Sequence, residues 1–295
     1  MFIMMKVKMK KNILITSLVI LFGLCSIWIA QYAFWWSLFW NDLYKQVLAW
    51  EAVPFDALHQ FNIERFDREL AVVRLDEAQV QMNWKRAGIF RPMIEKKLSA
   101  AWLPLDIFYL AIAESSLRET AVSSAWAAWI WQFMPSTAKA YGLRVDEYID
   151  ERYNTEKATD AAIKYLQKAY NKFWNWTLAM ASYNRGINGI ANDMASQYQS
   201  SFYDLWLNNE TSRYIFRIIA AKEVYKNPSR YFDISNWWGQ YSAPNTVEVE
   251  VGKVDDLAVW AAGKWYTYAE IRYLNPWIRK NALPEWVWKV KVYKR

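Results

Sequence analysis

Apolar residues recur with a helical period through much of the chain between residues 99 and 228. After Asn154, they follow the i, i+3, i+4, i+7 spacing of an amphipathic helix. The positions are Ala158, Ala161, Ala162, Tyr165, Leu166, Ala169, Tyr170 and Phe173. A shorter apolar helix is predicted from Trp176 to Tyr183, and another from Thr211 or Ser212 to the residue before Pro228. No alternating pattern interrupts this region, so the sequence predicts a mostly α-helical domain over residues 99–232.

The pattern changes after residue 232. A linker is predicted at 233–246, and Val247 to Val251 then alternate as a β-strand should. A helical stretch follows at 255–262, and Thr267 with Glu270 forms a capping box for a second short helix. Residues 287–293 alternate again. The sequence therefore predicts a small βααβ module over residues 247–295.

The first forty residues resemble a targeting element. A lysine-rich start precedes an uncharged, apolar run from Asn12 to Asn41. Its flanks suit a signal peptide, whereas its length suits a membrane anchor. Cys25 raises the question of a lipoprotein signal, but the preceding Leu24 is too large for such processing. We expect export to the cell envelope, in the periplasm or on the outer face of a membrane. Residues 41–98 read as a helical extension that packs on the following domain.

Composition excludes several classes of function. Four of the seven net positive charges come from lysines before residue 12, and the remaining +3 is too weak to indicate nucleic-acid binding, although it suits a mildly acidic polymer. The chain has one cysteine and one histidine, His59. Intrachain disulfides, a Cys/His zinc site and a Ser-His-Asp triad are therefore excluded. The content of 20 Trp against 8 Gly is anomalous.

One acid stands in an unusual place. Glu114 follows Ile107, Leu110 and Ala111 by seven, four and three residues, which puts its carboxyl on an apolar helical face. Burial there should raise its pKa, as a general acid requires. The alternative is a glutamate at a helix end that points to water, and periodicity alone does not decide between the two.

Several motifs, in order, resemble family 1 lytic transglycosylases, which are goose-lysozyme-like enzymes that cleave peptidoglycan, and in particular their membrane-bound D-type group. The resemblance covers roughly residues 60–232, and the C-terminal module is similar to a LysM repeat. The matching stretches are AESSL at 113–117, AVSSA at 121–125, WQFMPSTAKAYGL at 131–143, DERYNTEKATDAAIKYL at 150–166, ASYNRG at 181–186, TSRYIFRIIAA at 211–221 and NPSRY at 227–231.

The resemblance implies a lysozyme-like α-helical catalytic domain with Glu114 as its only catalytic acid and base. It implies that Tyr183 and Asn184 orient this glutamate and the N-acetyl group of the substrate. It further implies a sugar cleft lined by Ser123, Gln132, Met134 and Tyr214. Read without it, Tyr183 and Met134 fit a packed core, and Gln132 fits a bond to the backbone.

The implied reaction cleaves the β-1,4 bond between N-acetylmuramic acid and N-acetylglucosamine without water and leaves a 1,6-anhydro end. Glycosidases usually need two carboxylates. Here the acids nearest in sequence, Asp106 and Glu119, lie outside the matching motifs. A muramidase that hydrolyses the same bond is one alternative, and a non-catalytic peptidoglycan-binding protein is another. No metal or organic cofactor is implied, and the expected partner is the glycan strand, bound by a monomer.

The sequence departs from the family where glycine is usual. Trp126 and Trp129 occupy two glycine positions before the WQFMP motif, and four further tryptophans also stand at glycine positions: Trp102, Trp174, Trp265 and Trp286. Trp131 and Trp176, in contrast, fall where the family carries tryptophan. We interpret the six as glycines encoded by UGA codons. If Trp126 and Trp129 are literal, the cleft is obstructed and the binding-only alternative is favoured.

Overall fold

The computed structural model describes residues 42–118, 121, 123 and 126–295, so the predicted targeting segment at 1–40 lies outside the described residues. Residues 47–295 form one compact unit. Its helices are α2 (Gln60–Leu75), α3 (Glu77–Ala100), α4 (Ile107–Ser115), α5 (Pro135–Ala140), α6 (Thr155–Phe173), α7 (Trp176–Arg185), α8 (Ile187–Gln197), α9 (Asn209–Lys226), α10 (Leu257–Gly263) and α11 (Tyr268–Leu274). The strands are β1 (Val47–Leu48), β2 (Glu51–Ala52), β3 (Thr246–Val251) and β4 (Trp288–Tyr293), and short 3-10 turns occur at Ala57–His59, Glu151–Tyr153, Phe202–Asp204, Pro228–Arg230 and Ile234–Asn236.

None of the helices in the described ranges is both long enough and apolar enough to cross a membrane.

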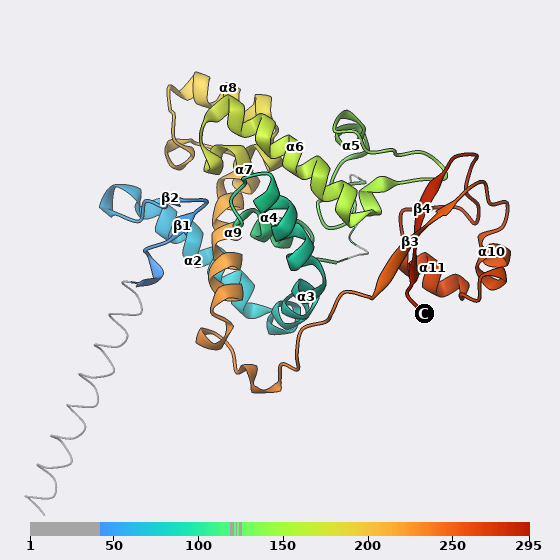
Figure 1. The fold of residues 1–295 in the computed structure, drawn as a ribbon. Helices are drawn as coiled ribbons and strands as arrows, with labels where there is room; N and C mark the ends of the chain where they lie inside the picture. The colour runs from blue at the N-terminus through green and yellow to red at the C-terminus, as the bar shows by residue number, and fades with distance from the viewer. Residues whose placement is uncertain (1–41, 119–120, 122, 124–125) are drawn as a thin grey trace, which may run out of the picture. The chain divides into compact units, whose positions relative to one another are not determined.

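Helix α9 forms the centre of the helical body, where it packs against α2, α4 and α7 (Figure 1). Ile215, Phe216, Ile218 and Ile219 are fully buried, because three neighbouring helices cover most of its circumference. The helix begins at Asn209, slightly before the predicted start, since the side chain of Asn208 caps it by accepting a hydrogen bond from the Thr211 backbone.

The predicted helices of the catalytic region are confirmed. Asn154 caps α6 by accepting a hydrogen bond from the backbone of Lys157, and the predicted apolar stripe of α6 faces the core. Asn175 caps α7 in the same way. The carboxylate of Glu51 accepts further bonds from the first-turn backbone N–H groups of Trp176 and Thr177, which places a negative charge at the positive end of the helix.

Residues 42–98 are mainly helical, as predicted. The small β1–β2 hairpin was not predicted, because two-residue strands are too short to produce an alternating pattern. Helix α2 packs on α9, so this extension contributes to the core of the body. Helix α3 continues to Ala100, across the predicted boundary at residue 99, and the domain boundaries themselves stay predictions.

The C-terminal module has the predicted strand–helix–helix–strand order. Strands β3 and β4 pair antiparallel, with Thr246 opposite Tyr293 and Val251 opposite Trp288. The capping box of Thr267 and Glu270 is present at the start of α11. Together with the helical body, this module confirms the predicted fold class, a mostly α protein with a small βααβ C-terminal module.

The module is joined to the helical body by backbone hydrogen bonds. The N–H of Asp150 donates to the carbonyl of Trp277 at 2.8 Å, and the N–H of Arg279 donates to the carbonyl of Tyr148 at 2.7 Å. The guanidinium of Arg279 lies 4.3 Å from the ring centroid of Tyr153. Polar backbone bonds and a cation–π contact therefore fix the module against the loop that precedes α6.

Candidate active site

Helix α4 presents Glu114 in its last turn. Ile107, Leu110 and Ala111 are fully buried, which confirms the apolar face predicted from the sequence. The Glu114 side chain keeps a small accessible surface, yet the surrounding protein displaces most water from its carboxyl. This desolvation raises the pKa of Glu114 from 4.5 to about 7, as the apolar face predicted. The carboxyl can therefore be protonated near neutral pH, as a general acid must be.

Tyr214 is the direct partner of Glu114. From α9, its hydroxyl donates a hydrogen bond to Oε1 of the carboxyl, which lowers the pKa of Glu114 and partly opposes the effect of burial. The same buried environment raises the pKa of Tyr214 well above its usual value, so the tyrosine stays a donor. The sequence assigned Tyr214 to the cleft only through its place in TSRYIFRIIAA, and the structure places it against the acid.

A charged network missed by the sequence lies beside this pair. One helical turn after Tyr214, the Arg217 guanidinium donates to the buried carboxylate of Glu69 at 3.2 Å and to Glu210 at 3.0 Å. Its positive charge lowers the pKa of Glu114, while the negative charge of Glu210 raises it. Arg213 also donates to Glu69, at 2.5 Å. The spacing of Arg213, Tyr214 and Arg217 on one helix was visible in the sequence, but the distant Glu69 that orders the arginines was not.

Tyr183 and Asn184, at the end of α7, form hydrogen bonds with groups other than the acid. The Tyr183 hydroxyl donates to the carbonyl of Trp131 at 2.8 Å, and its ring meets Tyr165 edge-on at 5.1 Å. Burial raises the pKa of Tyr183 well above its usual value, and the negative charge of Glu114 adds to this effect, which places the two side chains within electrostatic range. The side-chain oxygen of Asn184 accepts from the hydroxyl of Thr211 at 2.8 Å.

The loop from Ser123 to Met134 carries the other predicted cleft residues. Ser123 closes a turn, since its hydroxyl accepts from the Ala127 backbone at 3.0 Å. Gln132 donates to the backbone carbonyls of Ala121 and Trp129, which is the backbone-bonding alternative considered for it. Met134 is 39% exposed and precedes α5, so its side chain is not part of the core.

A buried arginine holds this loop in place. Arg152 donates to both carboxylate oxygens of Asp150, at 2.9 and 2.7 Å, and both side chains are almost fully buried. Its remaining nitrogen donates to the backbone carbonyls of Phe133 and Trp126. The guanidinium therefore anchors both ends of the loop segment 126–133. The sequence offered no signal for this role beyond the match of the surrounding motif.

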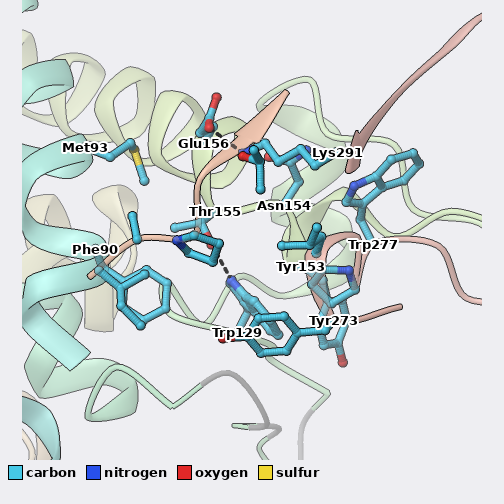
Figure 2. Close-up of a pocket in the computed structure, with 16 residues that line it drawn as sticks. Phe90, Met93, Trp129, Tyr153, Asn154, Thr155, Glu156, Tyr273, Trp277 and Lys291 are labelled. Carbon is cyan, nitrogen blue, oxygen red and sulfur yellow. Dashed lines mark hydrogen bonds and ion pairs between the residues drawn. The ribbon is translucent and has the colours of Figure 1, made fainter. Parts of the chain in front are cut away.

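A pocket lies at the boundary between the helical body and the C-terminal module, and Glu114 is not among its lining residues (Figure 2). This junction pocket has a volume of about 230 Å³ and is lined by aromatic and polar side chains from both parts. Trp129 and Tyr153 come from the body, and Tyr273, Trp277 and Lys291 come from the module. Lys291 forms an ion pair with Glu156 across the boundary at 2.5 Å.

We expect Tyr214→Phe to move the alkaline limb of the pH–rate profile to higher pH. The phenol stabilises the ionised form of Glu114, so its removal raises the pKa of the carboxyl above about 7 and keeps the acid protonated further into the alkaline range. Tyr225→Phe is the matched control, because Tyr225 is a half-buried, hydrogen-bonded tyrosine on the same helix whose partner is Asn83. An unchanged alkaline limb in Tyr214→Phe would contradict the assignment.

Fold and site together describe a helical domain that holds the desolvated acid Glu114 against Tyr214, followed by a βααβ module. Residues 92–205 match the transglycosylase SLT domain family. Residues 245–294 match the soluble lytic transglycosylase C-terminal LysM-like domain family. The chain therefore contains an SLT domain followed by a LysM-like domain, which confirms the resemblance seen in the sequence motifs.

Two relatives differ in how closely they match. The membrane-bound lytic murein transglycosylase D of Escherichia coli (strain K12) is 31% identical over 175 residues, which cover 56% of this chain and 39% of that protein. A putative tributyltin chloride resistance protein of Alteromonas sp. (strain M-1) is 24% identical over 146 residues, covering 48% of this chain and 66% of that protein. The chain thus matches about two-fifths of the length of the first relative and about two-thirds of the second.

Proposed function

We propose that this protein is a peptidoglycan lytic transglycosylase with Glu114 as its single acid and base. The observation that carries the proposal is the carboxyl of Glu114, desolvated until its pKa is about 7 and hydrogen-bonded to Tyr214, in a domain that matches the SLT family. Protonated Glu114 donates its proton to the glycosidic oxygen as the C1–O bond breaks. The carboxylate then removes the proton from the C6 hydroxyl of the same muramoyl residue, whose oxygen attacks C1 and closes the 1,6-anhydro ring.

The two other acids considered, Asp106 and Glu210, are each paired with a basic side chain, which supports a scheme in which Glu114 is the only reacting carboxyl. Asp106 is held by Lys222 at 2.7 Å and by the backbone of Ala49 at 2.8 Å. Glu210 is the acid whose charge acts on Glu114, and it is paired with Arg217. A hydrolytic muramidase would need a carboxylate that activates water. Glu210 is the candidate for that role.

The product distinguishes the two reactions. Mass spectrometry of digested peptidoglycan should show anhydro ends, which are one water lighter than the reducing ends left by a muramidase. Glu210→Gln should keep most of the activity and the same product. Reducing ends, together with a Glu210→Gln variant as inactive as Glu114→Gln, would instead establish the muramidase.

We further propose that Ser123, Gln132, Met134, Tyr183 and Asn184 border the sugar-binding cleft. Three observations support this role: the Tyr183 hydroxyl joins the end of α7 to the loop at Trp131, Asn184 is bonded to Thr211 on the same helix as Tyr214, and the charge of Glu114 acts on Tyr183. The proposed partner is the glycan strand, with the LysM-like module as a second point of attachment that raises the local substrate concentration. Aromatic side chains in the junction pocket suit stacking on sugar rings.

We place this activity in the cell envelope, with residues 1–40 acting as a signal peptide or a membrane anchor and the protein acting as a monomer without nucleic-acid partners. The relative from Escherichia coli is named as membrane-bound, which supports this location. Fractionation of cells into membrane and soluble envelope fractions tests it, because a cytoplasmic protein would appear in neither.

A further inference from the structure

The backbone separates two kinds of tryptophan in this protein. Among the described residues, eleven non-glycine residues have positive φ, and six of them are tryptophan: Trp50, Trp102, Trp126, Trp129, Trp174 and Trp265. Tryptophan makes up 20 of 295 residues, so fewer than one would be expected among eleven. The φ angles of the six lie between 52° and 70°, in the left-handed region that glycine enters freely and a bulky side chain enters at a cost.

Two of the six positions end helices in the geometry of a Schellman motif. After α3, the N–H of Leu103 bonds the carbonyl of Leu98, and Trp102 is the left-handed residue between them. After α10, Tyr266 bonds Ala261 around Trp265 in the same way. Helix α5 ends with the same pair of bonds, and there the left-handed position is occupied by Gly142, with φ of 90°. The same motif therefore holds glycine once and tryptophan twice.

The remaining positions are also sites where glycine is the usual residue. Trp174 is the left-handed cap of α6. Trp50 is the second residue of the two-residue turn that joins β1 and β2, and both turn residues have positive φ, as a type I′ turn requires. Trp126 and Trp129 lie in the loop anchored by Arg152. Among the described residues of these turns, no indole nitrogen donates a hydrogen bond to another residue of the same turn.

Exposure shows that most of these side chains do not contribute to the core. The side chains of Trp50, Trp102, Trp126, Trp174 and Trp265 are 72–90% exposed. Trp131 and Trp176, the positions where the family carries tryptophan, behave in the opposite way: both are buried, the Trp131 indole donates to Thr159, and Trp176 stacks on Tyr170 at 4.2 Å. The strained backbone conformation has a cost at each of these five positions. Among the five, the Trp174 indole meets the ring of Tyr170 edge-on at 5.9 Å, and it is still 76% exposed.

Trp129 is the exception among the six. Its indole is buried, donates to the hydroxyl of Thr155 at 2.9 Å and meets Tyr153 edge-on, so it fills one side of the junction pocket (Figure 2). Its φ of 67° is still that of glycine. Trp286, the remaining glycine position suggested by the family pattern, is exposed but has no positive φ, so the backbone gives no reason for glycine there.

We propose that residues 50, 102, 126, 129, 174 and 265 are glycine in the functional protein, encoded by UGA codons that the cell of origin reads as glycine. All six residues have left-handed backbones, five of them carry exposed indoles, and Gly142 occupies the same position in the helix-ending motif of α5. For residue 126 the inference also rests on the proposed function, because a glycine there leaves the loop around the catalytic cleft open to a glycan strand. Compared with the UGA positions interpreted from the sequence, the backbone adds residue 50 and gives no support for residue 286.

Thermal unfolding of designed chains tests the backbone argument without any assay of activity. We expect glycine at the five exposed positions (50, 102, 126, 174 and 265) to raise Tm by about 10 °C or more. Each glycine relieves the strain of the left-handed backbone and should shift the equilibrium toward the folded state about fivefold. Alanine at the same five positions removes the indole but keeps the Cβ, and it should recover only a small part of that gain. The matched control is glycine at Trp206, Trp238 and Trp286, which are equally exposed but have no positive φ, and it should leave Tm unchanged or lower it.

If the chain with tryptophan at these positions fails to fold, a soluble, helical five-glycine chain beside an insoluble five-alanine chain gives the same answer. The proposal would be overturned if the five-glycine chain had the same Tm as the tryptophan chain, or if the five-alanine chain gained as much. The mass of the intact protein from its cell of origin is decisive: six Trp-to-Gly differences support the inference, and UGG codons or an unchanged mass refute it.

Glycan cleavage separates this inference from the proposed function. In a chain with glycine at 50, 102, 174 and 265, glycine at 126 should increase the digestion of peptidoglycan at least tenfold over Trp126. If stability rises as expected but no chain digests peptidoglycan, the glycine assignment stands and the transglycosylase proposal fails. If a chain with all six tryptophans digests as fast as the six-glycine chain, the assignment fails at the cleft while the enzyme assignment stands.

Discussion

Glu114→Gln is expected to reduce peptidoglycan cleavage by about 10²–10⁴-fold, the range associated with loss of a general acid. The upper end applies here because the same carboxyl supplies the proton in the first step and removes one in the second. Glutamine keeps the size of the side chain and can still accept the hydrogen bond from Tyr214, so the site should keep its shape. Release of soluble fragments from purified peptidoglycan measures the loss.

The same substitution should stabilise the fold at alkaline pH. Burial raises the folded pKa of Glu114 to about 7, so the stability linked to its protonation is fully present below pH 4.5 and is lost as pH rises through about 7. Glutamine does not titrate, and we expect it to gain about 2 kcal/mol above pH 8, after allowance for the partial exposure of the side chain. Lost activity together with increased stability would exclude misfolding as the cause.

Glu95→Gln is the matched control, because Glu95 is a half-buried helical glutamate paired with Arg91 at 2.7 Å and has no contact with the site. The Glu95→Gln variant should digest peptidoglycan as fast as the protein that keeps Glu95. A Glu114→Gln variant that retains more than a tenth of the activity would remove Glu114 from its catalytic role. The comparison is best made with glycine at the six tryptophan positions discussed above.

Arg152→Ala is expected to lower the free energy of unfolding by about 3–5 kcal/mol. The change leaves the buried carboxylate of Asp150 without its partner and deprives the carbonyls of Phe133 and Trp126 of a donor. Because these carbonyls fix the loop at 126–133, activity should fall further than the loss of stability alone explains. Denaturant unfolding and digestion rates measured below the unfolding transition test the two effects.

Two further variants serve as controls for Arg152→Ala. Lys280→Ala removes an exposed ion pair with Glu147, 2.9 Å apart, and should leave the free energy of unfolding nearly unchanged, because solvent screens the pair. Replacing Asp150 and Arg152 together by apolar residues removes the unpaired charge, so it should destabilise the fold less than Arg152→Ala alone. An Arg152→Ala variant as stable as Lys280→Ala would contradict the anchoring role.

Local signals in the sequence were enough to predict most of the fold. The apolar stripe and the Asn154 cap of α6, and the capping box of Thr267 and Glu270, each depend on residues within one or two turns of each other. The β1–β2 hairpin escaped prediction because its strands have two residues each. The start of α9 was placed two or three residues too late because Asn208 was not recognised as its cap.

The candidate site was predictable where chemistry follows from a local pattern. The raised pKa of Glu114 follows from the apolar residues three, four and seven positions before it. The pairing of Arg217 with Glu69 could not be read from the sequence, because the two residues are separated by 148 positions. The anchoring of the loop by Arg152 depends on carbonyl groups, whose direction is set by the three-dimensional path of the backbone and not by residue type.

The C-terminal module shares a backbone hydrogen-bond network with the helical body, through Tyr148 and Asp150 on one side and Trp277 and Arg279 on the other. Because main-chain groups of both parts satisfy one another, separation would leave those groups unpaired in addition to exposing the aromatic pocket between them. The consequence is thermodynamic cooperativity. The two parts lose their structure together, and a calorimeter should record one unfolding transition for both.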